Sequence, residues 1–260
     1  MRRIIIHPGF HKTGTTGLQE TLRANRHILR PDIRLVLRPG MEALCDMARN
    51  YSETREDFDL DLVKYEATAL AESLASETAQ TIVITSRDIS GHMPGRRGLH
   101  GYGAVPKLMQ AIASAFLATL PRDELLFFIT TRQPDAWLHR SYDQHLRNSR
   151  LPLDLRDYMR RFKTAADFPA AITKIDEALP RYRVTSAAIE DHAKRPLGLA
   201  DAILDLAGVP DSRRAELEIK QTQSPKTAAR MRAKLLELNR SDLPAAALRE
   251  AKQSLLRGRT

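Results

Sequence analysis

Residues 9–16, which read GFHKTGTT, have the composition of a phosphate-binding loop. Glycines let the backbone curl so that successive N–H groups point at an anion, and a helix that begins at the end of the loop adds a favourable dipole. Gly9 and Gly14 keep the glycine spacing of the nucleotide-triphosphatase loop, but Thr15 stands where that loop has its lysine. The cation is found instead within the loop, at Lys12. This placement argues against an ATPase loop.

A second candidate anion site follows the apolar run LLFFITT at residues 125–131. Arg132 comes directly after this expected strand, and Ser141 lies within the next expected helix. A guanidinium fork and a helix hydroxyl together suit a phosphate dianion. Arg140 is an alternative ligand to Ser141. The structural alternative is that Arg132 only caps the sheet and pairs with a carboxylate such as Asp135.

Both motifs resemble those of the PAPS-dependent sulfotransferases, and of their bacterial members in particular. The resemblance rests on His-Lys-Thr-Gly-Thr-Thr after an apolar strand, and on a later strand followed by Arg, a Pro two residues on, and Ser-Tyr in the next helix. It is specific over residues 4–22 and 125–144, and looser through the C-terminal half. It implies 3′-phosphoadenosine-5′-phosphosulfate (PAPS) as donor, adenosine 3′,5′-bisphosphate (PAP) as product, and no required metal.

The resemblance also implies a role for each motif residue. Backbone N–H groups of residues 12–16 and the hydroxyls of Thr15 and Thr16 would hold the 5′-phosphate. Lys12 would contact the bridging oxygen and stabilise the charge that develops on the leaving phosphate. Arg132 and Ser141 would hold the 3′-phosphate. The implied donor-binding set is His11, Lys12, Thr13, Gly14, Thr15, Thr16, Arg132 and Ser141.

The sequence departs from the family pattern at the expected catalytic base. After the strand that matches residues 81–85, bacterial members often carry Ser-Ser-Glu, whereas this chain continues with Ser86 and Arg87, and Asp88 comes one place later. Asp88 is a candidate base, with a salt bridge to Arg87 as its alternative role. The other candidates are His11, next to Lys12, and His92 and His100 in the loop of residues 87–104, which is rich in glycine and arginine.

Strands that alternate with helices predict an α/β fold. Apolar or β-branched runs predict strands at residues 3–7, 33–37, 81–85, 125–131 and 182–189. Helical spacing predicts helices that start near residues 14 and 60, and others over 105–120, 135–147, 154–163, 167–179, 197–207, 225–239 and 243–257. We expect three α/β/α layers with a central, mainly parallel sheet, similar to a P-loop NTPase. Ligands should then bind at the carboxyl ends of the strands.

Composition limits the classes of protein. The 260 residues show no linker, so we expect one domain over residues 1–260, with a basic helical part from about 211 to 260. The net charge is +9, of which residues 213–260 hold +7. The short apolar run after the N-terminal arginines does not fit a signal peptide, and no stretch fits a membrane span, so we expect no stable membrane insertion. Cys45 is the single cysteine, which excludes an internal disulfide and favours a cytoplasmic protein.

Two other functions stay open. A P-loop nucleotide kinase or NTPase would use residues 82–88 as an apolar strand that ends in a Mg²⁺-binding Asp88, although the lysine after Gly14 is missing. A pseudoenzyme would keep the donor pocket, with Arg87 having replaced the base. Nucleic acid is not an expected partner, because no aromatic residues interleave with the C-terminal charges.

The acceptor is not readable from the sequence, because acceptor pockets are built from variable loops. The family resemblance points to a hydroxyl on a carbohydrate or a lipid-linked glycan, with amines and small alcohols as alternatives. The oligomeric state is equally unreadable.

Overall fold

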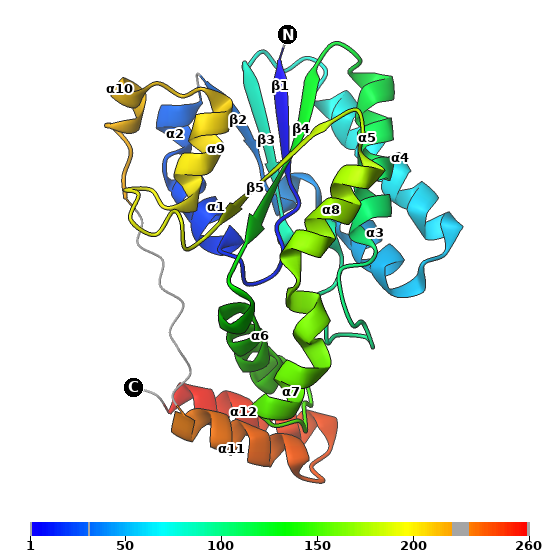
Figure 1. Ribbon diagram of the computed structural model, residues 1–260, viewed down its shortest axis with the longest axis vertical. Coiled ribbons are helices and arrows are strands. Elements are labelled where there is room, and N and C mark those ends of the chain that lie inside the picture. The colour runs from blue at the N-terminus through cyan, green and yellow to red at the C-terminus, as the bar shows by residue number, and fades with distance from the viewer. Residues whose placement is uncertain (1, 31, 220–228, 259–260) are drawn as a thin grey trace.

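The computed structural model describes residues 2–30, 32–219 and 229–258. Within these ranges, five strands form one sheet in the order β2-β3-β1-β4-β5 (Figure 1). The strands are β1 (Arg3–His7), β2 (Ile33–Val36), β3 (Thr81–Thr85), β4 (Glu124–Thr131) and β5 (Arg183–Ala188). All four pairings are parallel, and β1 lies between β3 and β4. Parallel neighbours need long crossover connections, which the helices supply.

Helices cover both faces of this sheet (Figure 1). Successive side chains of a strand point to opposite faces. Ile5 therefore packs with the residues of α1 and α9, whereas Ile4 and Ile6 pack with those of α3, α4 and α5. The expected α/β class with three layers is confirmed, and all the described strand pairs are parallel.

Twelve α-helices lie in the described ranges. They are α1 (Thr15–Ala24), α2 (Arg26–Leu29), α3 (Glu42–Thr54), α4 (Asp57–Ser73), α5 (Val105–Thr119), α6 (Pro134–Asn148), α7 (Leu155–Phe162), α8 (Phe168–Ala178), α9 (Leu199–Ala207), α10 (Asp211–Arg214), α11 (Ala229–Arg240) and α12 (Ala245–Arg257). The described ranges also contain three short 3-10 helices, η1 (Arg38–Gly40), η2 (Arg87–Ser90) and η3 (Lys163–Ala166). The strands and longer helices expected from the sequence are confirmed with small shifts at their ends, whereas α3 was not predicted.

The carboxyl ends of the central strands bring the two predicted motifs to one edge of the sheet. β1 continues into the loop that precedes α1, and β4 continues into Arg132. The neighbouring connections are tied to the same edge, because Ser86 donates its backbone N–H to the carbonyl of His7 at 3.2 Å and Ile189 donates to that of Thr131 at 3.0 Å. A ligand bound at this edge, as the sequence predicts, could therefore contact both motifs.

The basic C-terminal helices α11 and α12 pack beneath α6 (Figure 1). The Nε of Arg232 lies 2.6 Å from the Oδ1 of Asp143, which is nearly buried in α6. Asn239 donates its side-chain amide to the carbonyl of Leu146 at 3.1 Å, and the Nζ of Lys252 donates to that of Ser149 at 2.8 Å. We therefore propose that the whole chain folds as one domain. The expected start of a helix at residue 225, and the segment QTQSPK at 221–226, lie outside the described residues.

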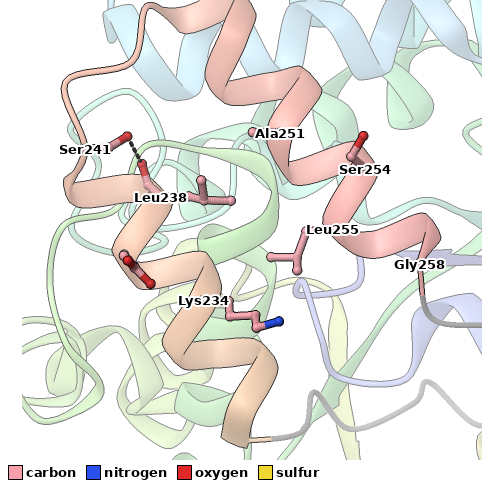
Figure 2. Close-up of a pocket in the computed structure, with 8 residues that line it drawn as sticks. Lys234, Leu238, Ser241, Ala251, Ser254, Leu255 and Gly258 are labelled. Atoms are coloured by element: carbon pink, nitrogen blue, oxygen red, sulfur yellow. Dashed lines mark hydrogen bonds between the residues drawn. The ribbon is translucent and has the colours of Figure 1, made fainter.

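A groove of about 670 Å³ runs between α11 and α12 (Figure 2). Leu238 and Leu255 form part of its apolar wall, and the Lys234 side chain lies beside it. All its lining residues belong to the segment 234–258, so neither predicted phosphate motif contributes to it. In the part of the chain that the structure describes, no helix has both the length and the apolar character needed to cross a membrane.

Candidate anion site

The loop between β1 and α1 curls because three of its residues adopt a left-handed backbone. Their φ angles are 54° at Gly9, 65° at Lys12 and 99° at Gly14. Glycine adopts such angles without steric cost, but a lysine does so rarely. The loop therefore holds Lys12 in an unfavourable conformation at its apex, which is typical of residues at ligand sites.

The two glycines of the loop are also required by close contacts. A Cβ atom on Gly9 would lie 2.6 Å from the Oγ1 of Thr15, and one on Gly14 would lie 2.5 Å from a methyl group of Leu199. The hydroxyl of Thr15 is buried and has no hydrogen-bond partner among the described residues. A buried polar group without a partner is costly, so this hydroxyl is available to a ligand.

A chain of hydrogen bonds holds the underside of the loop in place. The Oγ1 of Thr13 donates to the carbonyl of Phe10 at 2.7 Å and lies 2.8 Å from the Oγ1 of Thr130. The Nε2 of His7 lies 3.1 Å from the Oγ1 of Thr130, and its Nδ1 lies 2.7 Å from the Oγ1 of Thr85. Burial lowers the pKa of His7 to about 3, so the ring is neutral.

The donor and the acceptor of each hydrogen bond follow from the single proton that each hydroxyl or neutral imidazole can donate. Because Thr13 donates to a carbonyl, it must accept from Thr130, and Thr130 must then accept from the Nε2–H of His7. The Nδ1 of His7 accepts in turn from the hydroxyl of Thr85. A neutral His7 therefore links the ends of β3, β1 and β4 to the phosphate loop.

His11 is buried beside the loop and is held through its main chain. Its backbone N–H donates to the hydroxyl of Tyr102 at 3.0 Å, and its carbonyl accepts from the Nε1 of Trp137 at 2.7 Å. Burial, together with the charges of Arg87 and Lys12, keeps the pKa of His11 well below its ordinary value. The imidazole is therefore neutral near pH 7, which is the state in which it can accept a proton.

Lys12 is surrounded by arginines. Its pKa is lowered to about 8, first by burial and then by the charges of Arg87, Arg147, Arg140 and Arg132, in that order of effect. These arginines come from three separate segments, namely η2, α6 and the end of β4. Such a concentration of positive charge in a partly buried site attracts polyanions.

The lowered pKa of Lys12 predicts a pH-dependent anion affinity. Because the folded-state value lies below 10.5, the charged fraction of Lys12 falls as the pH rises through about 8. Inorganic sulfate keeps its charge over this range. We therefore expect the affinity of the protein for sulfate, measured by calorimetry at constant ionic strength, to fall by up to about tenfold between about pH 7 and pH 9.

The matched control for this effect is Lys12→Arg, because arginine stays protonated throughout. In this variant the affinity for sulfate should be nearly flat over the same pH range. An equal decline in the variant and the wild type would show that Lys12 does not control the anion affinity.

Arg132 lies under the loop rather than against the predicted acid. Its Nη1 donates to the carbonyl of Lys12 at 2.8 Å, and its Nε lies 3.8 Å from Oε1 of Glu190, in the segment after β5. The carboxylate beside it is thus Glu190, where the sequence had suggested Asp135. The buried Nε of Arg132 has no hydrogen-bond partner within the described residues. It can therefore donate to a ligand.

Ser141 and Arg140 differ in accessibility. Ser141 is fully buried in α6, and its hydroxyl has no hydrogen-bond partner in the described part of the chain. Arg140 is partly exposed, and its charge lowers the pKa values of both Lys12 and Arg132. Arg140 is the more exposed of the two candidates for the 3′-phosphate.

Asp88 is turned away from the phosphate loop. Its Oδ2 lies 3.0 Å from the Nη1 of Arg38 and 3.9 Å from the Nη1 of Arg49. The ion pair considered for Asp88 thus forms with Arg38 of η1 and Arg49 of α3, not with Arg87. The Nη1 of Arg87 instead donates to the Oγ1 of Thr16 at 3.1 Å. Arg87 thus contacts the start of α1 from η2, whereas Asp88 belongs to a structural ion-pair network.

The two histidines of the loop that follows η2 have other neighbours. His92 donates its backbone N–H to the hydroxyl of Ser52 at 2.9 Å, and its Nε2 lies 3.9 Å from Oε2 of Glu53. His100 is exposed and stacks on Phe162 with 6.2 Å between ring centroids. His92 is near enough to His11 to lower its pKa, so it lies at the rim of the site.

Comparisons with known proteins add one distant likeness. No family model and no curated protein matches the chain. Among solved structures, the crystal structure of a sulfotransferase from Alicyclobacillus acidocaldarius is 15% identical, with a TM-score of 0.48, and the match covers 99% of this chain and 95% of that chain. A likeness this distant does not establish a shared function, so the function rests on the residues of the site.

Several residues of the site carried no signal in the sequence. His7 appeared only as the end of a strand, and Tyr102 as part of a loop. The indole of Trp137 is fully buried in α6, and its Nε1 donates to the carbonyl of His11. In the described residues, no group of three His, Cys, Asp or Glu side chains has the arrangement of a metal site.

Proposed function

We propose that this protein is a sulfotransferase that moves a sulfonate group from PAPS to an acceptor hydroxyl, such as one on a carbohydrate. The observation that carries the proposal is the position of Lys12. It occupies the left-handed apex of a phosphate loop, among four arginines, while a threonine stands where a triphosphatase has its lysine. This arrangement suits a donor whose anionic groups lie on both sides of the loop.

The donor groups of the site fit the two phosphates of PAPS. The 5′-phosphate would accept from the backbone of the loop, from the hydroxyl of Thr15 and from Thr16, while Lys12 faces the bridging oxygen. The 3′-phosphate would accept from Arg132, whose Nε has no hydrogen-bond partner among the described residues, and from Arg140. Charge-assisted hydrogen bonds of this kind hold a phosphate about twice as strongly as neutral ones.

The transfer itself requires one base and one group that stabilises the leaving phosphate. The acceptor oxygen forms a bond to sulfur, the bond from sulfur to the bridging oxygen breaks, and the acceptor proton passes to a base. We assign the base to His11, because its imidazole is neutral, whereas Asp88 is neutralised by Arg38. Lys12 stabilises the charge on PAP as it leaves.

The proposal is tested by the affinities for PAP, ADP and ATP, measured by calorimetry without metal. We expect PAP to bind most tightly, because only PAP carries a 3′-phosphate. Arg132→Ala should weaken PAP binding by about 10- to 100-fold, the value of a charge-assisted hydrogen bond. The same substitution should weaken ADP binding less than PAP binding, because ADP has no 3′-phosphate and is affected only through the Lys12 carbonyl that Arg132 supports.

Arg122→Ala is the matched control, because Arg122 is exposed in the turn before β4. It should leave the affinity for PAP unchanged. ATP binding equal to or tighter than PAP binding, and improved by Mg²⁺, would replace the proposal with a nucleotide kinase or NTPase. PAP binding without any turnover of PAPS would indicate a non-catalytic protein that keeps the donor pocket.

A further inference from the structure

The segment between η2 and α5, residues 91–104, is fastened across the phosphate loop. At one end, the hydroxyl of Ser90 donates to the carbonyl of Pro8 at 3.0 Å. Near the other end, the hydroxyl of Tyr102 accepts from the backbone of His11. In between, the Nε2 of His145 in α6 donates to the carbonyl of Pro94 at 2.8 Å. This segment is therefore fixed beside the phosphate loop, and we call it the wall.

The wall brings positive charge to the loop. Arg96 is exposed and follows Pro94 and Gly95, which contact His145. Its charge lowers the pKa values of His11, His92 and His145. Among the described residues, no carboxylate forms an ion pair with Arg96. Its neighbour Arg97, in contrast, lies 3.6 Å from Oε2 of Glu53. The two adjacent arginines thus differ in whether an acid neutralises them.

Arg87 adds a second cation at the same place. Its Nη1 contacts the hydroxyl of Thr16, and within the described residues no carboxylate pairs with it. After burial, the charge of Arg87 is the largest cause of the lowered pKa values of both Lys12 and His11. Arg87 and Arg96 therefore both lower the pKa of the proposed base His11, Arg87 from η2 and Arg96 from the segment 91–104.

Arg87 and Arg96 are additional to the cations that bind the donor. On the proposed function, Lys12, Arg132 and Arg140 already meet the two phosphates of PAPS. Cations that face one another in a partly buried site repel, and a bound anion relieves that repulsion. We propose that the acceptor is itself an anion, a molecule with a carboxylate or sulfate group that Arg87 and Arg96 hold beside His11. This inference rests on the proposed function, and names the class of acceptor that the site selects.

The test uses inorganic sulfate as the probe of the acceptor side, with the donor pocket filled by PAP. Calorimetry should show sulfate binding to the PAP-saturated wild-type protein at constant ionic strength. Arg96→Asn and Arg87→Gln should each weaken this binding by about five- to tenfold, as expected for loss of a charged hydrogen-bond donor. Arg97→Asn is the matched control and should change it by less than about twofold. Asparagine tolerates the φ of 50° at residue 97.

Measuring the affinity for PAP distinguishes a failure of this inference from a failure of the proposed function. In Arg96→Asn it should stay within about twofold of the wild-type value, because Arg96 is assigned to the acceptor and not to the donor. The inference is overturned if PAP-saturated protein does not bind sulfate, if Arg97→Asn weakens binding as much as Arg96→Asn, or if Arg96→Asn weakens PAP as much as sulfate. A wild-type protein that binds no PAP overturns the proposed function instead.

Discussion

Replacing Lys12 with methionine is expected to lower the turnover of PAPS by about two to three orders of magnitude, the typical loss when one preorganised donor to a developing negative charge is removed. The side chain is about as long as lysine and, like it, unbranched at Cβ, so the backbone strain at the φ of 65° is unchanged. What is lost is the positive charge at the apex of the loop. The measurement is the rate of PAP release from PAPS, with water as acceptor until an acceptor is identified.

The affinity for PAP should fall much less than the rate in this variant, by about tenfold or less, because the backbone N–H groups and Arg132 remain. Lys107→Met is the matched control, since Lys107 is an exposed lysine of α5, and it should leave the rate unchanged. A Lys12→Met protein that releases PAP within about threefold of the wild-type rate would remove Lys12 from the chemical step.

The central strands could be predicted from the sequence because they are buried on both faces. Thr81–Thr85 is β-branched throughout, and Arg3–His7 holds three successive isoleucines between Arg3 and His7; the observed bounds of both match the expected ones. The edge strand β5 was expected at residues 182–189 and extends over Arg183–Ala188. Its side chains are only partly buried, so the pattern at its ends was weaker.

The helix α3 was missed although its buried residues follow helical spacing. Leu44, Cys45, Ala48, Tyr51 and Ser52 all lie on its inward face, but only Leu44 and Tyr51 are large, so the apolar signal in the sequence is weak. Ion pairs also tie α3 to its neighbours. Asp46 lies 3.2 Å from Arg38 of η1, and Arg49 lies 3.9 Å from Asp88 of η2.

The contiguous part of the candidate site follows from local spacing, whereas the rest depends on which segments meet. Gly9 and Gly14 indicated the curl of the loop because a phosphate nest needs such residues at fixed intervals. The approach of Arg87 to Thr16 joins residues 71 positions apart in the sequence. No local sequence pattern encodes that contact. The sequence also did not show that Arg87, and not Asp88, lies at the phosphate loop, because this depends on the ion pair between Asp88 and the distant Arg38.

Trp137→Ala is expected to lower the free energy of unfolding by about 3–5 kcal/mol, the usual cost of truncating a large buried aromatic side chain. Trp137 is fully buried, packs edge-on against Phe168 with 5.7 Å between ring centroids, and donates from Nε1 to the carbonyl of His11. The measurement is urea denaturation, with the dependence on urea concentration compared between variants to confirm that the same surface unfolds.

Trp137→Phe separates the hydrogen bond from the packing. Phenylalanine retains much of the apolar contact but leaves the carbonyl of His11 unpaired, which should cost about 1–3 kcal/mol. Because this carbonyl lies one residue before Lys12, the Phe variant should also weaken PAP binding, while a purely structural role would leave the affinity of the folded protein unchanged. An Ala variant destabilised by less than about 1 kcal/mol would contradict the burial of the indole and its place beneath the phosphate loop.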